Sequence, residues 1–412
     1  MEVLKEVNET SSEVVQETSM NSFKTWYEKL LVKPIDILNI ILLMGYLQTW
    51  FMADLAAKWE LNWDIFLIQN MISTLMVVVS AYYFASNNVE KRKYNWVLFI
   101  LVGYMVLSNL WSYMPNRGGT WELGIFLMYA VYLKNRYNTK QFLYLFNGFM
   151  ITVLVLSLLC VFYYPEKYIY LRKGVPVWKG MFGNKNTLGM AMIVASVTNL
   201  LVIMNYNRKL WKNILLGIIL LIELYTLYRS CSITSYLAAI GIFVVIGKNY
   251  FFPIKRFGIY FMGVIILGLL IVFGHQVVGQ IVATVTPRDV TFSGRTIIWD
   301  VTREYFINTP WIGHGYNGIW SQPELLDTIS NLIGSKLTET HNGIMDILLQ
   351  FGIIGLLLYT SVLYKFSVNI KENKEAFILF VLVLSLLFIG YGESIPVSFN
   401  TPYLILFFYC IL

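Results

Sequence analysis

Residues 257–274 read FGIYFMGVIILGLLIVFG, and no charged residue interrupts them. An α-helix needs about 20 mostly apolar residues to cross the hydrocarbon core of a bilayer, so this run predicts a membrane-spanning helix. Runs of the same kind recur along nearly the whole chain and leave no room for a separate soluble domain. The sequence therefore predicts an all-α integral membrane protein with a single membrane domain over residues 34–412.

The composition agrees with a membrane environment. Hydrophobic residues make up 57% of the chain and charged residues 13%, with a mean hydropathy of +0.60. Soluble domains usually have a charged fraction of about 25%. A net charge of +7 would suggest nucleic-acid binding in a soluble protein, but here we expect it to orient the helices. We therefore expect membrane lipids, and no nucleic acid, among the partners.

About twelve apolar runs, separated by polar breaks, are expected to span the membrane. The fourth and the eighth are the weakest. The runs cover residues 35–52, 64–85, 95–112, 121–134, 142–164, 187–205, 212–228, 233–247, 257–274, 343–364, 376–391 and 397–412.

The basic residues indicate how these spans are oriented. With the N-terminus in the cytoplasm, each cytoplasmic loop carries net positive charge, as the positive-inside rule requires. The loops contain Glu90, Lys91, Arg92, Lys93; Lys134, Arg136, Lys140; Arg208, Lys209, Lys212; Lys248, Lys255, Arg256; and Lys365, Lys371, Glu372, Lys374, Glu375. Residues 1–33 are then a polar cytoplasmic tail with an interfacial segment, and the first apolar run acts as an uncleaved signal anchor.

The loop between the fifth and sixth runs is unexpectedly basic for an external segment. It carries Glu166, Lys167, Arg172, Lys173, Lys179 and Lys185. Basic residues are disfavoured on that side, so this charge indicates an anionic ligand that approaches from outside. The alternative is a solvated loop in a topology that earlier helices have already anchored.

A second external segment, from about 275 to 342, is too long for a simple connection and is expected to contain two short helices. It holds all three histidines of the chain, His275, His314 and His341. Histidine is the side chain best suited to proton transfer near neutral pH, so their confinement to one segment points to a site. Three residues can also cluster by chance.

Two motifs in this segment have residue types suited to binding and catalysis. A helical pattern after Ser293–Gly294 places Arg295 and Trp299 one turn apart, which suits a phosphate next to a sugar ring or the lipid interface. An ordinary interfacial helix with a snorkelling arginine is the alternative. His341 stands where the chain re-enters the membrane, either as a base for a hydroxyl group or as an interfacial cap.

Other candidates have a structural alternative. The glycine-dense segment Pro310–Gly318, which contains His314, is a poor nucleotide loop and is better interpreted as a tight structural turn. Glu223 lies about halfway across its span and Arg229 near the outer mouth, which suggests a functional site or a structural pair. Neither the cysteines nor the carboxylates have the spacing of metal ligands, so no metal or other cofactor is expected.

Taken together, several short motifs of this chain resemble the O-antigen ligase and polymerase (WaaL/Wzy C-terminal-domain) superfamily of bacterial membrane glycan-assembly enzymes. The resemblance covers mainly residues 180–370, in the order found in that family. The matching residues are Gly183–Asn184–Lys185–Asn186 and Leu188–Gly189; Ser293–Gly294–Arg295 and Trp299; Pro310, Gly313 and Gly315; and His341–Asn342 followed by Gly352 and Gly355.

The resemblance implies a GT-C-like, all-helical glycosyltransferase in the bacterial inner membrane. Such an enzyme takes a glycan from an undecaprenyl-diphosphate carrier at the outer leaflet and transfers it to an acceptor hydroxyl, with inversion and without a metal. By resemblance, Arg229 and Arg295 clasp the diphosphate and His341 activates or positions the acceptor. Lys185, Asn186, Arg172 and Lys173 supplement donor binding. The segment around Arg229 matches the family's Ser-Arg pattern only loosely.

The resemblance leaves more than one function open. We favour a polymerase that joins carrier-linked repeat units of a surface polysaccharide, over a ligase that passes finished glycan to a terminal glycan or lipid acceptor. A chain-length regulator and a flippase are the implied partners. Two alternatives belong to other classes of protein. One is a lipid-linked oligosaccharide flippase or transporter, although the two halves of the chain show no matched pair of broken helices. The other is a non-enzymatic assembly scaffold.

Overall fold

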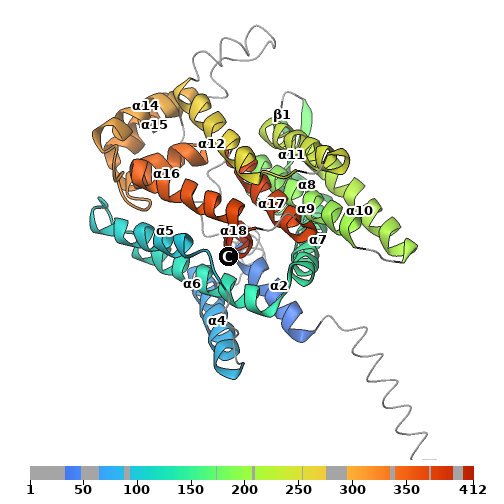
Figure 1. Ribbon diagram of the computed structural model, residues 1–412. Helices are drawn as coiled ribbons and strands as arrows, with labels where there is room; N and C mark the ends of the chain where they lie inside the picture. The colour runs from blue at the N-terminus through green and yellow to red at the C-terminus, as the bar shows by residue number, and fades with distance from the viewer. Residues whose placement is uncertain are drawn as a thin grey trace, which may run out of the picture.

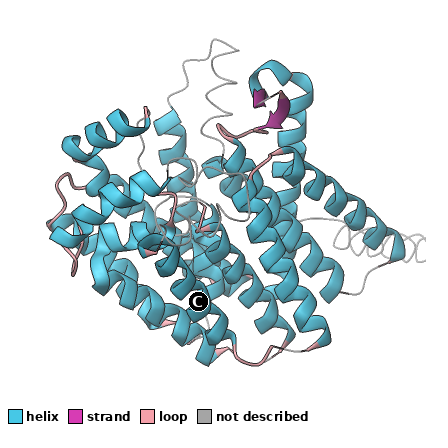
Figure 2. Ribbon diagram, turned by 90° about the horizontal axis from the view of Figure 1, so that it is seen from above, coloured by secondary structure: helices cyan, strands magenta, loops and turns pink. Residues whose placement is uncertain are grey.

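The computed structural model describes residues 33–47, 65–87, 93–172, 174–206, 209–252, 254–274, 295–334, 339–370, 373–392 and 402–412. The tail at residues 1–32, Lys173, His275 and the Ser293–Gly294 pair lie outside these ranges. The described residues form a bundle of helices with one small hairpin, as Figures 1 and 2 show.

Each of the twelve expected spans overlaps one α-helix. The helices are α2 (Pro34–Leu47), α4 (Ile65–Ser86), α5 (Trp96–Leu107), α6 (Arg117–Arg136), α7 (Thr139–Tyr163), α9 (Lys185–Asn205), α10 (Leu210–Arg229), α11 (Ile233–Phe251), α12 (Phe257–Phe273), α16 (Gly343–Asn369), α17 (Lys374–Ile389) and α18 (Pro402–Ile411).

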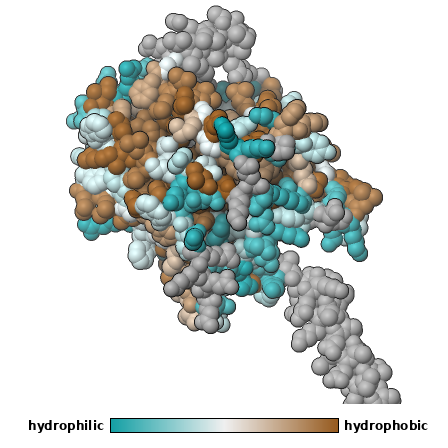
Figure 3. All heavy atoms as spheres, viewed as in Figure 1, coloured by the Kyte–Doolittle hydropathy of each residue, from teal (hydrophilic) through white to brown (hydrophobic). Residues whose placement is uncertain are grey.

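Within the described residues, six helices are long and apolar enough to cross a membrane, namely α7, α9, α10, α11, α16 and the part of α4 from Leu67 to Ser86. Shorter apolar helices occur in α2, α5, α12 and α18. Large apolar side chains are exposed along most of these helices, although α18 is buried, and apolar residues cover much of the face seen in Figure 3. Such a surface is stable only in lipid. The protein is therefore a multi-pass membrane protein.

The segment between α12 and α16 contains the two short helices expected there. They are α14 (Arg295–Asn308) and α15 (Pro323–Ile333), and they lie together at one edge of the bundle beside α16 (Figure 1). The sequence did not lead us to expect the antiparallel hairpin of β1 (Ile169–Arg172) and β2 (Val175–Trp178), which follows the short helix α8 (Pro165–Tyr168). Strands of four residues are too short for an alternating pattern to stand out.

The helices α17 and α18 lie at the centre of the bundle. Almost every residue of α17 and all of α18 are buried, which is typical of helices that are apolar on all faces. Beside them, α9 packs closely on α11. A β-carbon at Gly189 would lie 2.4 Å from the Ser235 hydroxyl oxygen, so only glycine permits this approach.

Helix α16 is broken at Gly352, where φ is 65° and ψ is −165°. A β-carbon there would lie 2.3 Å from the Trp311 carbonyl, because the glycine-dense turn packs into the break. Four backbone hydrogen bonds join turn and helix: Ile353 N to Pro310 O (2.8 Å), Ile354 N to Trp311 O (3.1 Å), His314 N to Leu349 O (2.8 Å) and Gly315 N to Gln350 O (2.8 Å).

These bonds satisfy backbone groups that a broken helix would otherwise leave unpaired in an apolar environment. They agree with the interpretation of Pro310–Gly318 as a structural turn. The break itself was not expected from the sequence, because a glycine inside an apolar run is compatible with a continuous helix.

Candidate functional site

The candidate site is built around the turn that precedes α16. Asn342 is the N-cap of this helix, and its side-chain oxygen accepts hydrogen bonds from Ile344 N (3.0 Å) and Met345 N (3.2 Å). His341, one residue earlier, has a positive φ of 54°, which non-glycine residues rarely adopt. Such a conformation persists only where the surrounding structure holds it.

Two buried side chains hold this turn. The Asp346 carboxylate, on the first turn of α16, accepts hydrogen bonds from Thr340 N (3.3 Å) and from the Thr340 hydroxyl (2.9 Å). The indole N–H of Trp299, from α14, donates to Thr340 O at 3.0 Å. Helices α14 and α16 thus fix the backbone on the N-terminal side of His341.

The sequence did not lead us to Asp346, although a carboxylate in the first turn of a helix is a recognisable signal. Trp299 was expected to offer its ring to a sugar or to the lipid interface. The structure places it elsewhere, because only 3% of the residue is exposed and its polar atom is bonded to Thr340. Trp299 therefore supports the turn from within the protein.

A second carboxylate lies against His341. Oε1 of Glu339 is 3.1 Å from Nδ1 of His341, and each side chain is 20% exposed. An ionised carboxylate can only accept a hydrogen bond, so Nδ1 carries the proton in this pair. In the neutral imidazole the Nε2 atom is then the acceptor. Glu339 was not among the residues expected from the sequence.

The side chain of Arg295, at the start of α14, contacts the turn that follows α17. Its Nη2 donates to Gly392 O at 2.8 Å, and Gly343 N donates to Gly390 O at 2.7 Å. The turn at residues 390–392, which follows α17, therefore contacts both Arg295 and the start of α16. Of the two residues expected to be catalytic, Arg295 contacts this turn directly, and His341 precedes Gly343 by two residues.

The turn between α10 and α11 adjoins this region. A β-carbon at Gly392 would lie 2.7 Å from Cβ of Thr234, whose hydroxyl is 3.3 Å from the Ser232 hydroxyl. Ser232 donates to the Asn186 side-chain oxygen at 3.0 Å, and Lys185 Nζ donates to Cys231 O at 2.7 Å. A continuous series of contacts thus links the start of α9 to Arg295.

Arg229 ends α10, two residues before Cys231. Its guanidinium carbon lies 5.0 Å from the centre of the Trp178 ring, so strand β2 covers it. Its Nε is buried and has no hydrogen-bond partner among the described residues. The same holds for the side-chain nitrogen of Asn342. Buried donors are rarely left without an acceptor, so both are suited to an anionic or polar ligand.

Two of the remaining expected residues differ in their surroundings. Arg172 is exposed at the end of β1, and Lys173 is outside the described residues. Glu223 is fully buried within α10 and accepts a hydrogen bond from Asn199 of α9 at 3.2 Å. Six residues separate it from Arg229, about 9 Å along a helix, and this agrees with the structural alternative for Glu223.

His314 also has a structural environment. Its Nε2 is 2.9 Å from the Thr309 hydroxyl and 3.0 Å from Tyr305 O, and its Nδ1 is 3.3 Å from the Gln322 side-chain nitrogen. Burial lowers the pKa of His314 below its ordinary value of 6.5, so the neutral ring is favoured. Both nitrogens are engaged, so His314 stabilises the turn that enters α16.

Among the described residues, no group of three or more His, Cys, Asp or Glu side chains is arranged to hold a metal ion. Cys160, Cys231 and Cys410 are free thiols.

Comparison with known protein families gives a match. The model of the Wzy_C family, described as O-antigen ligase, matches residues 214–360. This segment includes Arg229, Arg295, His341 and the break in α16, whereas Lys185 and Asn186 precede it. No curated protein matches the chain.

The family implies lipid-linked glycan and acceptor substrates in general. The match confirms the resemblance stated from the motifs. The match over residues 214–360 supports a relationship to the O-antigen ligase/polymerase superfamily, a family of glycosyltransferase-like membrane enzymes.

Proposed function

We propose that this protein takes a glycan from an undecaprenyl-diphosphate carrier and transfers it to an acceptor hydroxyl, as a polymerase of carrier-linked repeat units. The observation that supports this most is that the turn at 390–392 contacts both Arg295 and Gly343, which follows His341 by two residues. Through Thr234 this turn also adjoins the turn between α10 and α11, to which Lys185 bonds. A set of cations next to a histidine–carboxylate pair has the groups that this reaction needs.

The cations suit the donor. Arginine presents its N–H groups in a planar fork that matches phosphate oxygens, and Arg295 and Arg229 lie at the two turns that adjoin each other through Thr234 and Gly392. Lys185 adds a positive charge at the same turn. As the diphosphate leaves, its negative charge increases, and fixed cations stabilise the departing group more than the bound donor.

The histidine suits the acceptor. Glu339 holds the proton on Nδ1 of His341, which leaves Nε2 to accept the proton of the attacking hydroxyl. The acceptor oxygen then bonds to the anomeric carbon while the bond from that carbon to the diphosphate oxygen breaks. Attack opposite the leaving group inverts the anomeric centre. Protonated His341 later loses the proton to solvent, and no metal ion takes part.

The charge distribution supports an extracytoplasmic site. Lys209 and Lys212 stand at the start of α10, and Lys255 and Arg256 at the start of α12, whereas Arg229 lies at the opposite end of α10. By the positive-inside rule the lysine-rich ends face the cytoplasm. The proposal therefore places about twelve GT-C-like spans in one domain over residues 34–412, with residues 1–33 in the cytoplasm of the bacterial cell.

The test is mass spectrometry of undecaprenyl-linked glycans in a deletion strain complemented with the wild type or with His341→Ala at equal protein levels. Accumulated single repeat units in the deletion strain, which the variant fails to relieve, are the result expected for a polymerase. Long carrier-linked chains would instead indicate a ligase that passes finished glycan to a terminal acceptor. An unchanged pool of carrier-linked glycan would overturn both functions.

A further inference from the structure

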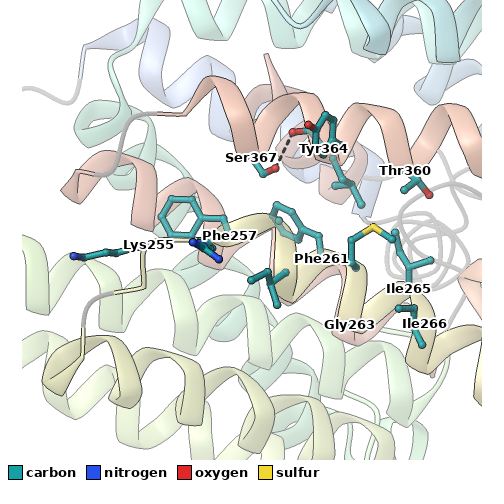
Figure 4. Close-up of a pocket in the computed structure, with 14 residues that line it drawn as sticks. Lys255, Phe257, Phe261, Gly263, Ile265, Ile266, Thr360, Tyr364 and Ser367 are labelled. Carbon is teal, nitrogen blue, oxygen red and sulfur yellow. Dashed lines mark hydrogen bonds between the residues drawn. The ribbon is translucent and has the colours of Figure 1, made fainter.

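A groove of about 600 Å³ lies at the surface of the bundle between α12 and the second half of α16, where Ile259 and Ile266 are exposed. Its walls are apolar over most of their length, and Figure 4 shows Lys255 at one end and Thr360 with Ile266 at the other. From α12 the lining includes Phe257, Phe261, Met262 and Ile265, and from α16 Leu363 and Tyr364.

The groove is separated from the candidate site. Beyond Ile266, a β-carbon at Gly268 would lie 2.8 Å from Ile344 and 2.9 Å from Tyr391, so α12 is closely packed there. The lining residues of α12 run from Phe257 to Ile266, about 15 Å along a helix. This is half of the ~30 Å hydrocarbon core, so the groove has the depth of one leaflet.

The end of the groove away from the candidate site is cationic. Lys255 and Arg256 are exposed, line the groove, and have no ion-pair partner among the described residues. Arg256 is the N-cap of α12 and makes no side-chain cap hydrogen bond. The first N–H groups of a helix carry partial positive charge and favour phosphate. The N-terminus of α12, two cations and the apolar groove thus meet at this end.

We propose that this groove binds an anionic glycerophospholipid of the leaflet opposite the candidate site. Its phosphate lies at the start of α12 between Lys255 and Arg256, and an acyl chain follows the apolar wall as far as Ile266. The position of these two cations decides against the carrier lipid as occupant, and this step rests on the proposed function. The diphosphate of a donor bound at Arg295 would be at the other end of α12.

The test uses the full-length protein, delipidated in detergent, and native mass spectrometry with one of three added lipids: phosphatidylglycerol, phosphatidylcholine of identical acyl chains, or undecaprenyl phosphate. The wild type is expected to retain one phosphatidylglycerol at least tenfold more tightly than phosphatidylcholine. Lys255→Gln/Arg256→Gln is expected to weaken phosphatidylglycerol binding about tenfold to thirtyfold and to abolish the preference. Thr360→Trp, which fills the groove from α16, is expected to weaken the binding of both lipids.

Two variants serve as controls. Thr360→Val keeps the volume and removes only the hydroxyl, which donates to Leu356 O within the helix. Lys209→Gln/Lys212→Gln removes the same charge at the start of α10, a helix that also begins without a side-chain cap. Neither is expected to change lipid binding, and monodisperse elution confirms that each variant is folded.

Three results would overturn the proposal. The first is equal retention of both phospholipids by the wild type, as expected of bulk lipid. The second is the same loss of binding in the α10 charge variant. The third is a combination of two observations: the α12 charge variant still binds phosphatidylglycerol, and undecaprenyl phosphate binds to every variant except Thr360→Trp. That combination would assign the groove to an isoprenoid tail.

Discussion

The Glu339 carboxylate lies 3.1 Å from Nδ1 of His341, two residues further along the chain, and the two side chains are equally exposed. This relationship orients the imidazole and fixes which nitrogen carries the proton. It also gives the proposed transfer reaction an acceptor for the hydroxyl proton on a turn that α14 and α16 both hold.

Removal of the base is expected to slow the transfer step itself. His341→Ala should lower kcat by about 10²- to 10⁴-fold, the usual contribution of general acid–base catalysis. Glu339→Gln should lower kcat less, with little change in the KM for donor, because Gln can still accept from Nδ1 but does not stabilise the charged ring. The measurement is product formation from purified lipid-linked donor.

Asp327→Asn, on the exposed side of α15, is the matched control for the loss of a carboxylate. It should retain wild-type kcat. Equal losses in Glu339→Gln and Asp327→Asn would contradict a specific role for Glu339.

Arg295 is expected to act on the donor diphosphate. Arg295→Ala should reduce kcat/KM by about 10²-fold or more, as removal of a charge-stabilising donor commonly does. Arg295→Lys should recover part of the activity, since it restores charge without the planar fork. Arg303→Ala, two turns later on α14 and exposed, is the control and should be active. The same assay measures all three variants.

Asp346 is expected to stabilise the fold around the site. Asp346→Ala leaves the N–H and hydroxyl of Thr340 buried without this acceptor and should lower the free energy of unfolding by about 1–3 kcal/mol. Asp346→Asn should cost less because its amide oxygen can still accept one bond. Thermal unfolding in detergent measures the difference. Identical Tm values for wild type and Asp346→Ala would show that the contact contributes nothing.

Gly352 is expected to be irreplaceable at the break in α16. Its φ and ψ lie in a region almost restricted to glycine, and Gly352→Ala would also drive a β-carbon into the Trp311 backbone. We expect the yield of folded protein to collapse. Gly217→Ala, where the space is open and the backbone helical, should fold and gain up to about 1 kcal/mol. Size-exclusion chromatography with fluorescence detection compares them.

His314 is expected to make stability depend on pH. Because burial lowers its pKa below 6.5, the unfolded chain binds this proton more readily than the folded protein. The stability from the neutral ring is complete above pH 6.5 and decreases as the pH falls below that value. In Tm measurements from pH 7.5 to 5, His314→Asn should lose less than the wild type. Parallel curves would contradict the prediction.

Much of the helical layout was predictable from the sequence. The hydrocarbon core has no water to pair with a bare backbone, so long apolar runs must form helices, and each expected run overlaps one. The short helices α14 and α15 were also expected, because the segment from about 275 to 342 is too long for a simple connection. The motifs around Arg295 and His341 also identified the superfamily, which the match over residues 214–360 confirmed.

Only the tertiary structure decided which residues meet. Arg295 and Gly392 are 97 positions apart, and no local pattern joins them. Trp299 turns inward, Glu223 bonds to Asn199, and the turn at 310–315 enters α16. In water, the apolar stripe of a helix shows which face packs, but in lipid every face of a spanning helix is apolar. The sequence therefore determined which segments are helices, and side-chain packing between distant segments decided where the site lies.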